Sequence, residues 1–188
     1  MCKGEFRAVL EMPSGEMLTV RRLCDGNGPA LQDFNAGLSE KTRSVFLPHA
    51  YDDKTVADYI GRSEQDMDRI YVAFAGEKIV AYFFLWEIGS PNGLLGIGIA
   101  DAYQNQGLGT QMMRILIEDA KALGLNGMEL TTVLDNARAF HLYEKVGFHY
   151  VRDVDNVAGD GRVVRERMMF YPIAPDARPS DHEFKPPA

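Results

Sequence analysis

Hydrophobic positions along the chain follow two different spacings. Short apolar or alternating runs, typical of β-strands, occupy residues 6–11, 17–23, 70–75, 79–88, 94–100, 129–133, 148–154 and 163–171. Apolar residues three and four positions apart, typical of amphipathic helices, occupy residues 29–38, 53–61, 108–123 and a short segment after residue 136. The chain is therefore predicted to be a mixed α/β protein.

Turn residues between these segments indicate which strands are neighbours. Residues 13–15, 76–77 and 158–161 contain glycine or proline and lie between strand-like runs, so each predicts a hairpin. The stretch 39–49 is expected to be a linker. From residue 172 onward, five prolines and mixed charges indicate a poorly ordered tail. The predicted organisation is one domain over residues 1–171 and a tail over residues 172–188.

The stretch between strand 94–100 and helix 108–123 carries the strongest chemical signal. It reads Gln104-Asn105-Gln106-Gly107-Leu108-Gly109-Thr110. A strand that turns into a helix through glycines leaves backbone N–H groups unpaired, and the helix dipole adds positive potential there. The glycines also let an anion approach the main chain without a side chain in the way. The stretch is predicted to cradle a phosphate or pyrophosphate.

Other interpretations of this glycine pattern compete with the anion cradle. A tight turn without a ligand explains a Gly-x-Gly at a helix start equally well, so the pattern alone is weak. A Walker-type loop requires a lysine that does not follow Gly109, and a dinucleotide fingerprint requires a third glycine where the chain has Met112. The remaining pattern is Gln-x-x-Gly-x-Gly.

A second motif follows the cradle along the chain. It reads Asn136-Ala137-Arg138-Ala139-Phe140-His141-Leu142-Tyr143-Glu144-Lys145-Val146-Gly147-Phe148. Together, in this order and spacing, the two motifs resemble the Gcn5-related N-acetyltransferase (GNAT) superfamily. In that family a Gln/Arg-x-x-Gly-x-Gly/Ala loop holds the coenzyme A pyrophosphate, and a later Asn…Ala…Leu-Tyr-x-Lys-x-Gly-Phe segment completes the site. The resemblance is close over residues 94–148 and elsewhere covers only the order of elements.

The resemblance implies a three-layer fold with a twisted, mostly antiparallel sheet of six to seven strands and about four flanking helices. It implies acetyl-CoA as cosubstrate, bound by the Gln104–Thr110 loop, by Asn136, and by the backbone of Ile97, Gly98 and Ile99 along the pantetheine arm. Gly96 and Gly98 weaken their strand, which fits a close backbone approach by a ligand. Tyr143 matches the family tyrosine that contacts the coenzyme and protonates the departing thiolate, and a phenol with a pKa near 10 stays protonated near neutrality.

The group that accepts the proton of the acceptor amine is less well determined. An alkylammonium with a pKa near 10.4 must lose a proton, which costs ~4 kcal/mol at pH 7 without assistance. Family members that acetylate protein N-termini on the ribosome often have a glutamate five residues before the asparagine, where this chain has Thr131. Glu87, at the end of strand 79–88, is predicted to be the base, because it is expected nearer the acceptor cleft than Glu129. Glu129 is expected to be a solvated charge.

Composition limits the classes of partner. A net charge of −7 over 188 residues argues against nucleic acid and is compatible with a cationic amine. No apolar run approaches the ~20 residues that span a bilayer, and the N-terminus lacks a secretory layout, so a cytoplasmic protein without membrane contact is expected. Cys2, Cys24 and the histidines show no ligand spacing, which predicts no metal. His49 is expected at the surface or in a loop, and His141 is expected to be exposed.

These observations favour an N-acetyltransferase that transfers acetyl from acetyl-CoA to a small-molecule primary amine by direct attack. A protein lysine or N-terminal acetyltransferase is an alternative, disfavoured by Thr131. A non-catalytic acyl-CoA-binding regulatory module is another alternative, disfavoured by the presence of Tyr143. The sequence leaves open the acceptor, the use of other acyl groups, and whether the chain is a monomer or a homodimer.

Overall fold

The computed structural model describes residues 5–181, in which one eight-stranded sheet has the order β1-β2-β3-β4-β5-β6-β8-β7. All neighbouring strands are antiparallel except β5 and β6, which are parallel. The strands are β1 (Phe6–Glu11), β2 (Met17–Arg22), β3 (Arg69–Ala75), β4 (Lys78–Trp86), β5 (Asn92–Ile99), β6 (Gly127–Val133), β7 (His149–Val157) and β8 (Val163–Pro172).

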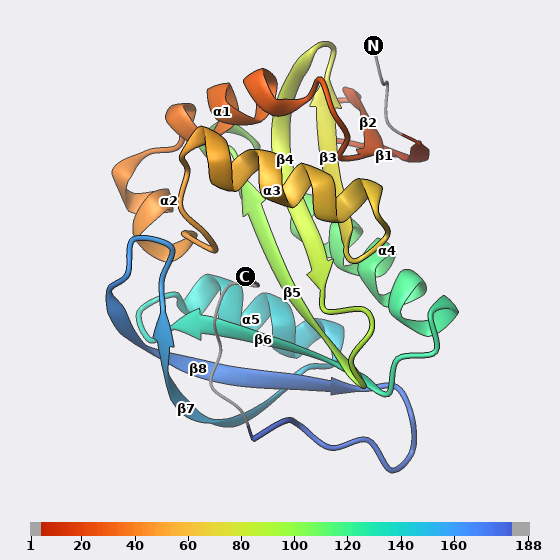
Figure 1. Cartoon of the computed structure of the whole chain (residues 1–188), viewed down its shortest axis with the longest axis vertical. Helices are drawn as coiled ribbons and strands as arrows, with labels where there is room; N and C mark the ends of the chain where they lie inside the picture. The colour runs from red at the N-terminus through yellow and green to blue at the C-terminus, as the bar shows by residue number, and fades with distance from the viewer. Residues whose placement is uncertain (1–4, 182–188) are drawn as a thin grey trace.

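Helices cover both faces of this sheet, which gives three layers (Figure 1). The helices are α1 (Gly28–Gly37), α2 (Glu40–Val45), α3 (Asp53–Glu64), α4 (Leu108–Ala122) and α5 (Ala137–Val146), with a short 3-10 helix η1 (Asp101–Tyr103). One hydrophobic cluster joins α1 and α3 to the sheet, and a second cluster joins α4 and α5 to its other face. Figure 1 shows α1 and α3 in front of β3 and β4, with α4 behind them. None of the helices between residues 5 and 181 is long and apolar enough to cross a membrane.

The predicted mixed fold and its three hairpins are confirmed, with two differences in the number of elements. The described chain has eight sheet strands where the resemblance implied six to seven, because both strands of the N-terminal hairpin join the sheet, β2 beside β3 and β1 beside β2. It has five α-helices where about four were predicted, because the expected linker at 39–49 contains α2. Ser39 starts this helix as its N-cap, since its hydroxyl accepts a hydrogen bond from the Thr42 N–H at 3.2 Å.

Strand β4 lies at the centre of the fold and contributes side chains to both hydrophobic clusters. Phe83 and Leu85 face α4, whereas Tyr82, Phe84 and Trp86 face α1 and α3. This alternation follows from the period of two in a strand. Because β4 is buried on both faces, it reads as a continuous apolar run in the sequence.

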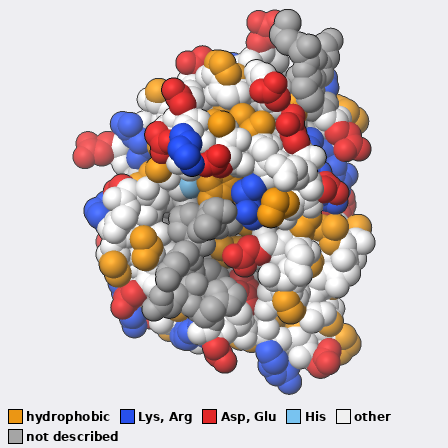
Figure 2. Space-filling view, in the orientation of Figure 1, with side chains coloured by type: hydrophobic (Ala, Val, Ile, Leu, Met, Phe, Trp, Pro, Cys, Tyr) orange, Lys and Arg blue, Asp and Glu red, His pale blue; other side chains and the backbone are white. Residues whose placement is uncertain are grey.

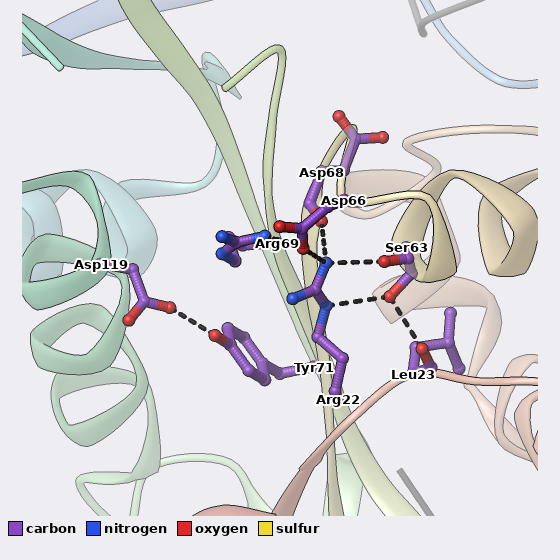
Figure 3. A network of polar contacts seen from close by, with 8 residues as sticks. All are labelled: Arg22, Leu23, Ser63, Asp66, Asp68, Arg69, Tyr71 and Asp119. Atoms are coloured by element: carbon purple, nitrogen blue, oxygen red, sulfur yellow. Dashed lines mark hydrogen bonds and ion pairs between the residues drawn. The ribbon is translucent and has the colours of Figure 1, made fainter. Parts of the chain in front are cut away.

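A polar network fixes the end of α3 against the sheet (Figure 3). The Arg22 guanidinium on β2 donates to the Ser63 hydroxyl at 3.1 Å, to the Ser63 carbonyl at 2.6 Å and to the Asp68 carbonyl at 2.6 Å. Ser63 in turn donates to the Leu23 carbonyl at 2.7 Å. The buried ends of α3 and β2 therefore have hydrogen-bonding partners, which holds this helix at a defined height above the sheet.

The parallel pair at the middle of the sheet is short. Strand β5 pairs with β6 only through residues 92–94, opposite residues 127–129. Beyond these residues the two strands diverge, and Figure 1 shows β6 and β8 crossing β4 and β5 at a wide angle. This divergence splits the sheet into two parts and opens a space between β5 and β6.

The segment after residue 171 lies against the closed end of this split. The N–H groups of Ile173 and Ala174 both donate to the Asn126 carbonyl at 2.9 Å. Ser180 donates through its N–H and its hydroxyl to the Glu129 carboxylate, each at 2.6 Å. Glu129 is 2% exposed, so the expectation of a solvated charge was wrong. The domain boundary after residue 171 stays a prediction, and residues 182–188 of the predicted tail lie outside the described residues.

Candidate active site

A cavity of about 480 Å³ occupies the split between β5 and β6. Its wall is built from β5, the N-terminus of α4, one face of α5, the loop between α2 and α3, and the β7–β8 hairpin. Most of the site residues predicted from sequence line it. These are Ile97, Gly98, Ile99, Gln104, Asn105, Gly107, Leu108, Gly109, Thr110, Asn136 and Tyr143. Gln106 and Glu87 are outside the lining.

The loop before α4 has the tight geometry expected of an anion cradle. Asn105 and Gly107 both have left-handed backbones, with φ of 62° and 80°, and Gly107 is the N-cap of α4. The Gln104 side chain fastens the loop to its surroundings by donating to the Ile99 carbonyl at 2.9 Å and to the Thr42 hydroxyl at 3.1 Å. Gln106 instead turns back and donates to the Ala102 carbonyl at 2.8 Å. The first N–H groups of α4 consequently open toward the cavity from a constrained loop.

Arg138 adds a positive charge beside this loop, and its contribution was not foreseen from the sequence. Its Nη1 donates to Gln104 Oε1 at 2.8 Å and lies 3.4 Å from Asn105 Oδ1. Arg138 also lines the cavity. The sequence did hold a signal for this role, because Arg138 falls in the first turn of the helix predicted after Asn136. Helix N–H groups, a left-handed glycine and a nearby guanidinium together fit the pyrophosphate of coenzyme A.

The glycines of the site serve different purposes. A Cβ at Gly107 would meet no atom within 4 Å, so its positive φ is what requires glycine there. A Cβ at Gly109 would lie 2.9 Å from Leu142 Cδ2, so this glycine lets α4 and α5 pack closely. In β5, a Cβ at Gly96 or Gly98 would lie 2.2 Å from the ring of Phe84 or of Phe46, respectively. The strand glycines therefore make room for aromatic rings, and the close approach of a ligand that the sequence indicated stays a prediction.

The backbone of β5 faces the cavity where β6 has diverged. The Ala100 N–H donates to the Val80 carbonyl on β4 at 2.9 Å. Because alternate residues of an antiparallel pair bond to the same neighbour, Ile97 and Ile99 direct their backbone groups away from β4. The Ile99 carbonyl accepts from Gln104, which leaves the Ile97 N–H and carbonyl facing the cavity. These groups suit an extended ligand arm containing amides.

Tyr143 lies on the buried face of α5 and is 8% exposed. Burial, together with the negative charge of Glu166, raises the pKa of Tyr143 to about 12. Its phenol is therefore protonated throughout the physiological range. At the start of the same helix, the Asn136 side chain accepts from the Ala139 N–H at 3.2 Å and so acts as an N-cap. The cap sets the direction in which α5 presents Tyr143 to the cavity.

Glu87 lies just beyond the end of β4, in a left-handed conformation with φ of 59°. Its N–H donates to Asp68 Oδ1 at 2.9 Å. The hydrogen bond to Asp68 raises the pKa of Arg62, and the negative charge of Glu87 adds a smaller contribution in the same direction. Both neighbours belong to the polar cluster at the end of α3. The structure does not bring Glu87 into the cavity lining, and its assignment as base stays a prediction.

His49 lies in the loop between α2 and α3, as one of the two expectations had it, but it is 1% exposed and is therefore not at the surface. Its ring stacks on that of Tyr59 with centroids 4.4 Å apart. Nδ1 donates to the Ala50 carbonyl at 2.7 Å, so Nε2 accepts from the Tyr82 hydroxyl at 3.2 Å in the neutral tautomer. Burial lowers the pKa of His49 to about 4. The histidine is a neutral part of the wall behind the cavity.

The loop between α2 and α3 meets the β7–β8 hairpin across the cavity. The Gly159 N–H donates to the Leu47 carbonyl at 3.0 Å. A Cβ at Gly159 would lie 2.1 Å from the His49 carbonyl carbon, so only glycine allows this approach. Leu47, Pro48 and Ala158 all line the cavity beside this junction, which we call the roof contact.

Glu166 on β8 is a site residue that the sequence analysis missed. Among the described residues that line the cavity, it is the only carboxylate. Asn156 on β7 donates from Nδ2 to Glu166 Oε2 at 2.8 Å and to the Thr131 hydroxyl at 3.1 Å. The alternation of side chains along the strand could have revealed Glu166, because it places Glu166 on the same face as the apolar residues Val164 and Met168. A carboxylate on an otherwise apolar face indicates a functional position.

On the rest of the described chain, charged side chains form ion pairs and networks with one another and not an anion cradle. On the face shown in Figure 2, acidic and basic side chains are interspersed. Within residues 5–181, no group of three or more His, Cys, Asp or Glu side chains is arranged to hold a metal ion. Cys24 is buried beside Asn27, and Cys2 lies outside the described residues. The cavity is therefore the part of the described chain that combines an anion cradle with titratable groups.

Comparison with known proteins agrees with this geometry. The model of the acetyltransferase (GNAT) family matches residues 33–148, more than half of the chain. The uncharacterized N-acetyltransferase YobR of Bacillus subtilis (strain 168) is 36% identical over 72 residues, which cover 38% of this chain and 29% of YobR. The chain thus spans less than a third of the length of that relative.

Two solved structures illustrate the likeness in fold. The GNAT domain of S. lividans PAT has a TM-score of 0.73 at 16% identity and covers 88% of this chain and 96% of its own. RimL, a ribosomal L7/L12 alpha-N-protein acetyltransferase solved with coenzyme A, has a TM-score of 0.73 at 15% identity. The match covers 92% of this chain and 100% of RimL. Because the family model matches across both the cradle and the whole second motif, the chain belongs to the acetyltransferase (GNAT) family.

Proposed function

We propose that the protein transfers the acetyl group of acetyl-CoA to the primary amine of a small molecule. The observation that carries this proposal is a single cavity that joins the anion cradle, the free backbone of β5, a protonated tyrosine and one carboxylate. These are the parts that direct acetyl transfer to an amine requires. A coenzyme-binding module without turnover would need only the first two.

Each part of the cavity has a separate task in this proposal. The α4 N-terminus and Arg138 hold the pyrophosphate, and the Ile97 backbone orients the arm that follows it. When bound, acetyl-CoA supplies an acetyl thioester whose carbonyl carbon is electrophilic. Tyr143 keeps its proton until charge develops nearby and then donates it. The apolar wall excludes water and so limits hydrolysis.

The roof contact is evidence in favour of a small acceptor molecule. The hydrogen bond from Gly159 to the Leu47 carbonyl joins two loops over one side of the cavity. A folded protein or an extended peptide would have to separate these loops to pass through this side. A small amine enters without breaking the contact.

Acetylation of a protein N-terminus or lysine is the second candidate, and the structural neighbour RimL acts on a ribosomal protein. Release of free thiol from acetyl-CoA, measured against a panel of small amines and a panel of peptides, separates the two functions. We expect turnover with small amines and at most background rates with peptides. Turnover with peptides alone would instead favour a protein acetyltransferase. Binding of the coenzyme without any turnover would indicate a non-catalytic binding module.

A further inference from the structure

Glu166 stands out because its carboxylate lies in the cavity and forms no ion pair with any of the described residues. We propose that Glu166 binds the ammonium group of the acceptor and removes its proton, and that the acceptor is an amine with an apolar body. This inference rests on the function proposed above. It names a catalytic residue and a substrate class that the anion cradle does not define.

One carboxylate oxygen of Glu166 is held in place by the structure. Oε2 accepts from Asn156, whose amide also bonds the Thr131 hydroxyl on β6. Within the described residues, no hydrogen bond is made to Oε1. A carboxylate with one oxygen fixed and one available can receive an N–H of an incoming ammonium group without reorganisation.

The charged groups around Glu166 are engaged elsewhere. Arg162, which lines the same cavity, donates from Nε to Asp160 at 2.6 Å. Arg165 faces the other side of β8 and pairs with Asp155 at 3.0 Å. Arg167 donates to the Leu134 carbonyl at 2.6 Å. These partners leave the negative charge of Glu166 available to a cation from outside.

Among the described residues that line the cavity with Glu166, the other titratable groups are Tyr103, Tyr143 and the guanidinium groups of Arg138 and Arg162, and these two arginines bond to Gln104 and Asp160. The cross-strand partners of Glu166 are Val133 on β6 and Val154 on β7, and Asn156 and Thr131 are uncharged. From α5 comes Tyr143, whose pKa is raised in part by the charge of Glu166. An ammonium ion is therefore the natural counter-ion for this carboxylate.

Proton transfer to Glu166 makes Tyr143 a better acid. The charge of Glu166 opposes ionisation of the phenol, and neutralising the carboxylate removes that opposition. Deprotonation of the amine and protonation of the leaving group are thus linked through one electrostatic interaction. The tyrosine becomes a stronger acid only after the nucleophile has been generated.

The reaction balances with these two residues. An ammonium N–H bond breaks and its proton passes to Glu166, which frees the nitrogen lone pair. That pair forms the C–N bond to the acetyl carbon, and the C–S bond breaks with its electrons on sulfur. The thiolate takes the proton of Tyr143. The second proton lost by the nitrogen restores Tyr143, and Glu166 releases its proton to solvent.

The opposite wall of the cavity defines the rest of the acceptor. Phe84, Trp86 and Leu94 line it, with Phe46 beside Gly98. The rings of Phe84 and Trp86 are stacked with centroids 3.8 Å apart. Aromatic surfaces favour an apolar or aromatic substrate body, and they also attract a cation that passes over them.

The proposal is tested with 2-phenylethylamine and its 2,2-difluoro analogue, whose fluorines lower the amine pKa so that a larger fraction is neutral near pH 7. Thiol release is measured from pH 6 to 10 for the wild type, Glu166→Gln and the control Glu118→Gln, which changes an exposed carboxylate on α4. We expect Glu166→Gln to lower kcat/KM about a hundredfold at pH 7 with 2-phenylethylamine, and progressively less toward pH 10. The loss with the fluorinated amine should be smaller at pH 7, and Glu118→Gln should match the wild type.

Calorimetric titration with 2-phenylethylamine in the absence of acetyl-CoA gives a readout that does not need turnover. We expect Glu166→Gln to bind the ammonium about tenfold to a hundredfold more weakly, while thermal stabilisation by acetyl-CoA stays unchanged. If the wild type binds the amine through Glu166 but acetylates nothing, the proposed function fails and the ammonium site stands. Equal losses for both amines at every pH, unchanged activity, or the same pH-dependent loss in Glu87→Gln alone would each overturn the assignment of Glu166.

Discussion

Substitution of Gly107 by valine tests the anion cradle without disturbing packing. Gly107 has a φ of 80°, and a Cβ there meets no atom within 4 Å, so a side chain can start from this position without a clash at its Cβ. Gly124, at the other end of α4, offers a matched control with a φ of 72° and the same open surroundings. Gly109 is unsuitable, because its Cβ would press on Leu142.

The expected magnitudes differ between the free and the liganded protein. A left-handed backbone costs a non-glycine residue roughly 1–2 kcal/mol, so both variants should lose about 2–8 °C in Tm without ligand. Acetyl-CoA at one hundred times its Kd stabilises the wild type by about 2.7 kcal/mol, or roughly 5–11 °C. If valine at 107 weakens binding about a hundredfold, the same concentration stabilises that variant by only about 0.4 kcal/mol.

Differential scanning fluorimetry with and without acetyl-CoA measures both effects. We expect Gly124→Val to retain the full ligand-induced shift and Gly107→Val to retain about 1–2 °C of it. A full shift in Gly107→Val would refute the pyrophosphate assignment. If both variants lost the ligand-induced shift, the cause would be a general destabilisation of α4 and not a specific effect on the anion cradle.

Three further outcomes follow from the site. Tyr143→Phe should reduce turnover roughly a hundredfold in a thiol-release assay while leaving the acetyl-CoA thermal shift unchanged, because the ring's packing is kept and only the proton is lost. Arg138→Gln should weaken acetyl-CoA binding about tenfold by calorimetry, with a reduced dependence of Kd on salt. Since the pKa of His49 falls from 6.5 to about 4 on folding, the unfolded chain binds the extra proton between these values. The free energy of unfolding should thus be highest above pH 6.5 and fall by up to about 3 kcal/mol toward pH 4. In denaturant titrations, His49→Gln should show a smaller fall, whereas the control His141→Gln, which changes an exposed histidine, should show the same fall as the wild type.

Local patterns were enough to predict the class of fold and the position of the cradle. Strand alternation, helical spacing and turn residues act over a few neighbouring positions, so they can be read from the sequence directly. The Gln104–Thr110 loop belongs to this class, because a glycine at a helix start depends on backbone geometry within one turn. The structure places Gly107 at that start with the left-handed conformation that glycine allows.

Long-range contacts determined the parts of the site that were missed or misread. Glu166 enters the cavity because β5 and β6 separate after three paired residues and β8 follows β6. His49 is buried because the β7–β8 hairpin lies across its loop, and Glu129 is buried because Ser180 folds back onto β6. These partners are distant along the chain, so no spacing within either segment reveals them. Periodicity indicates which side of a strand a residue occupies, whereas the divergence of the sheet decides which sides face the cavity.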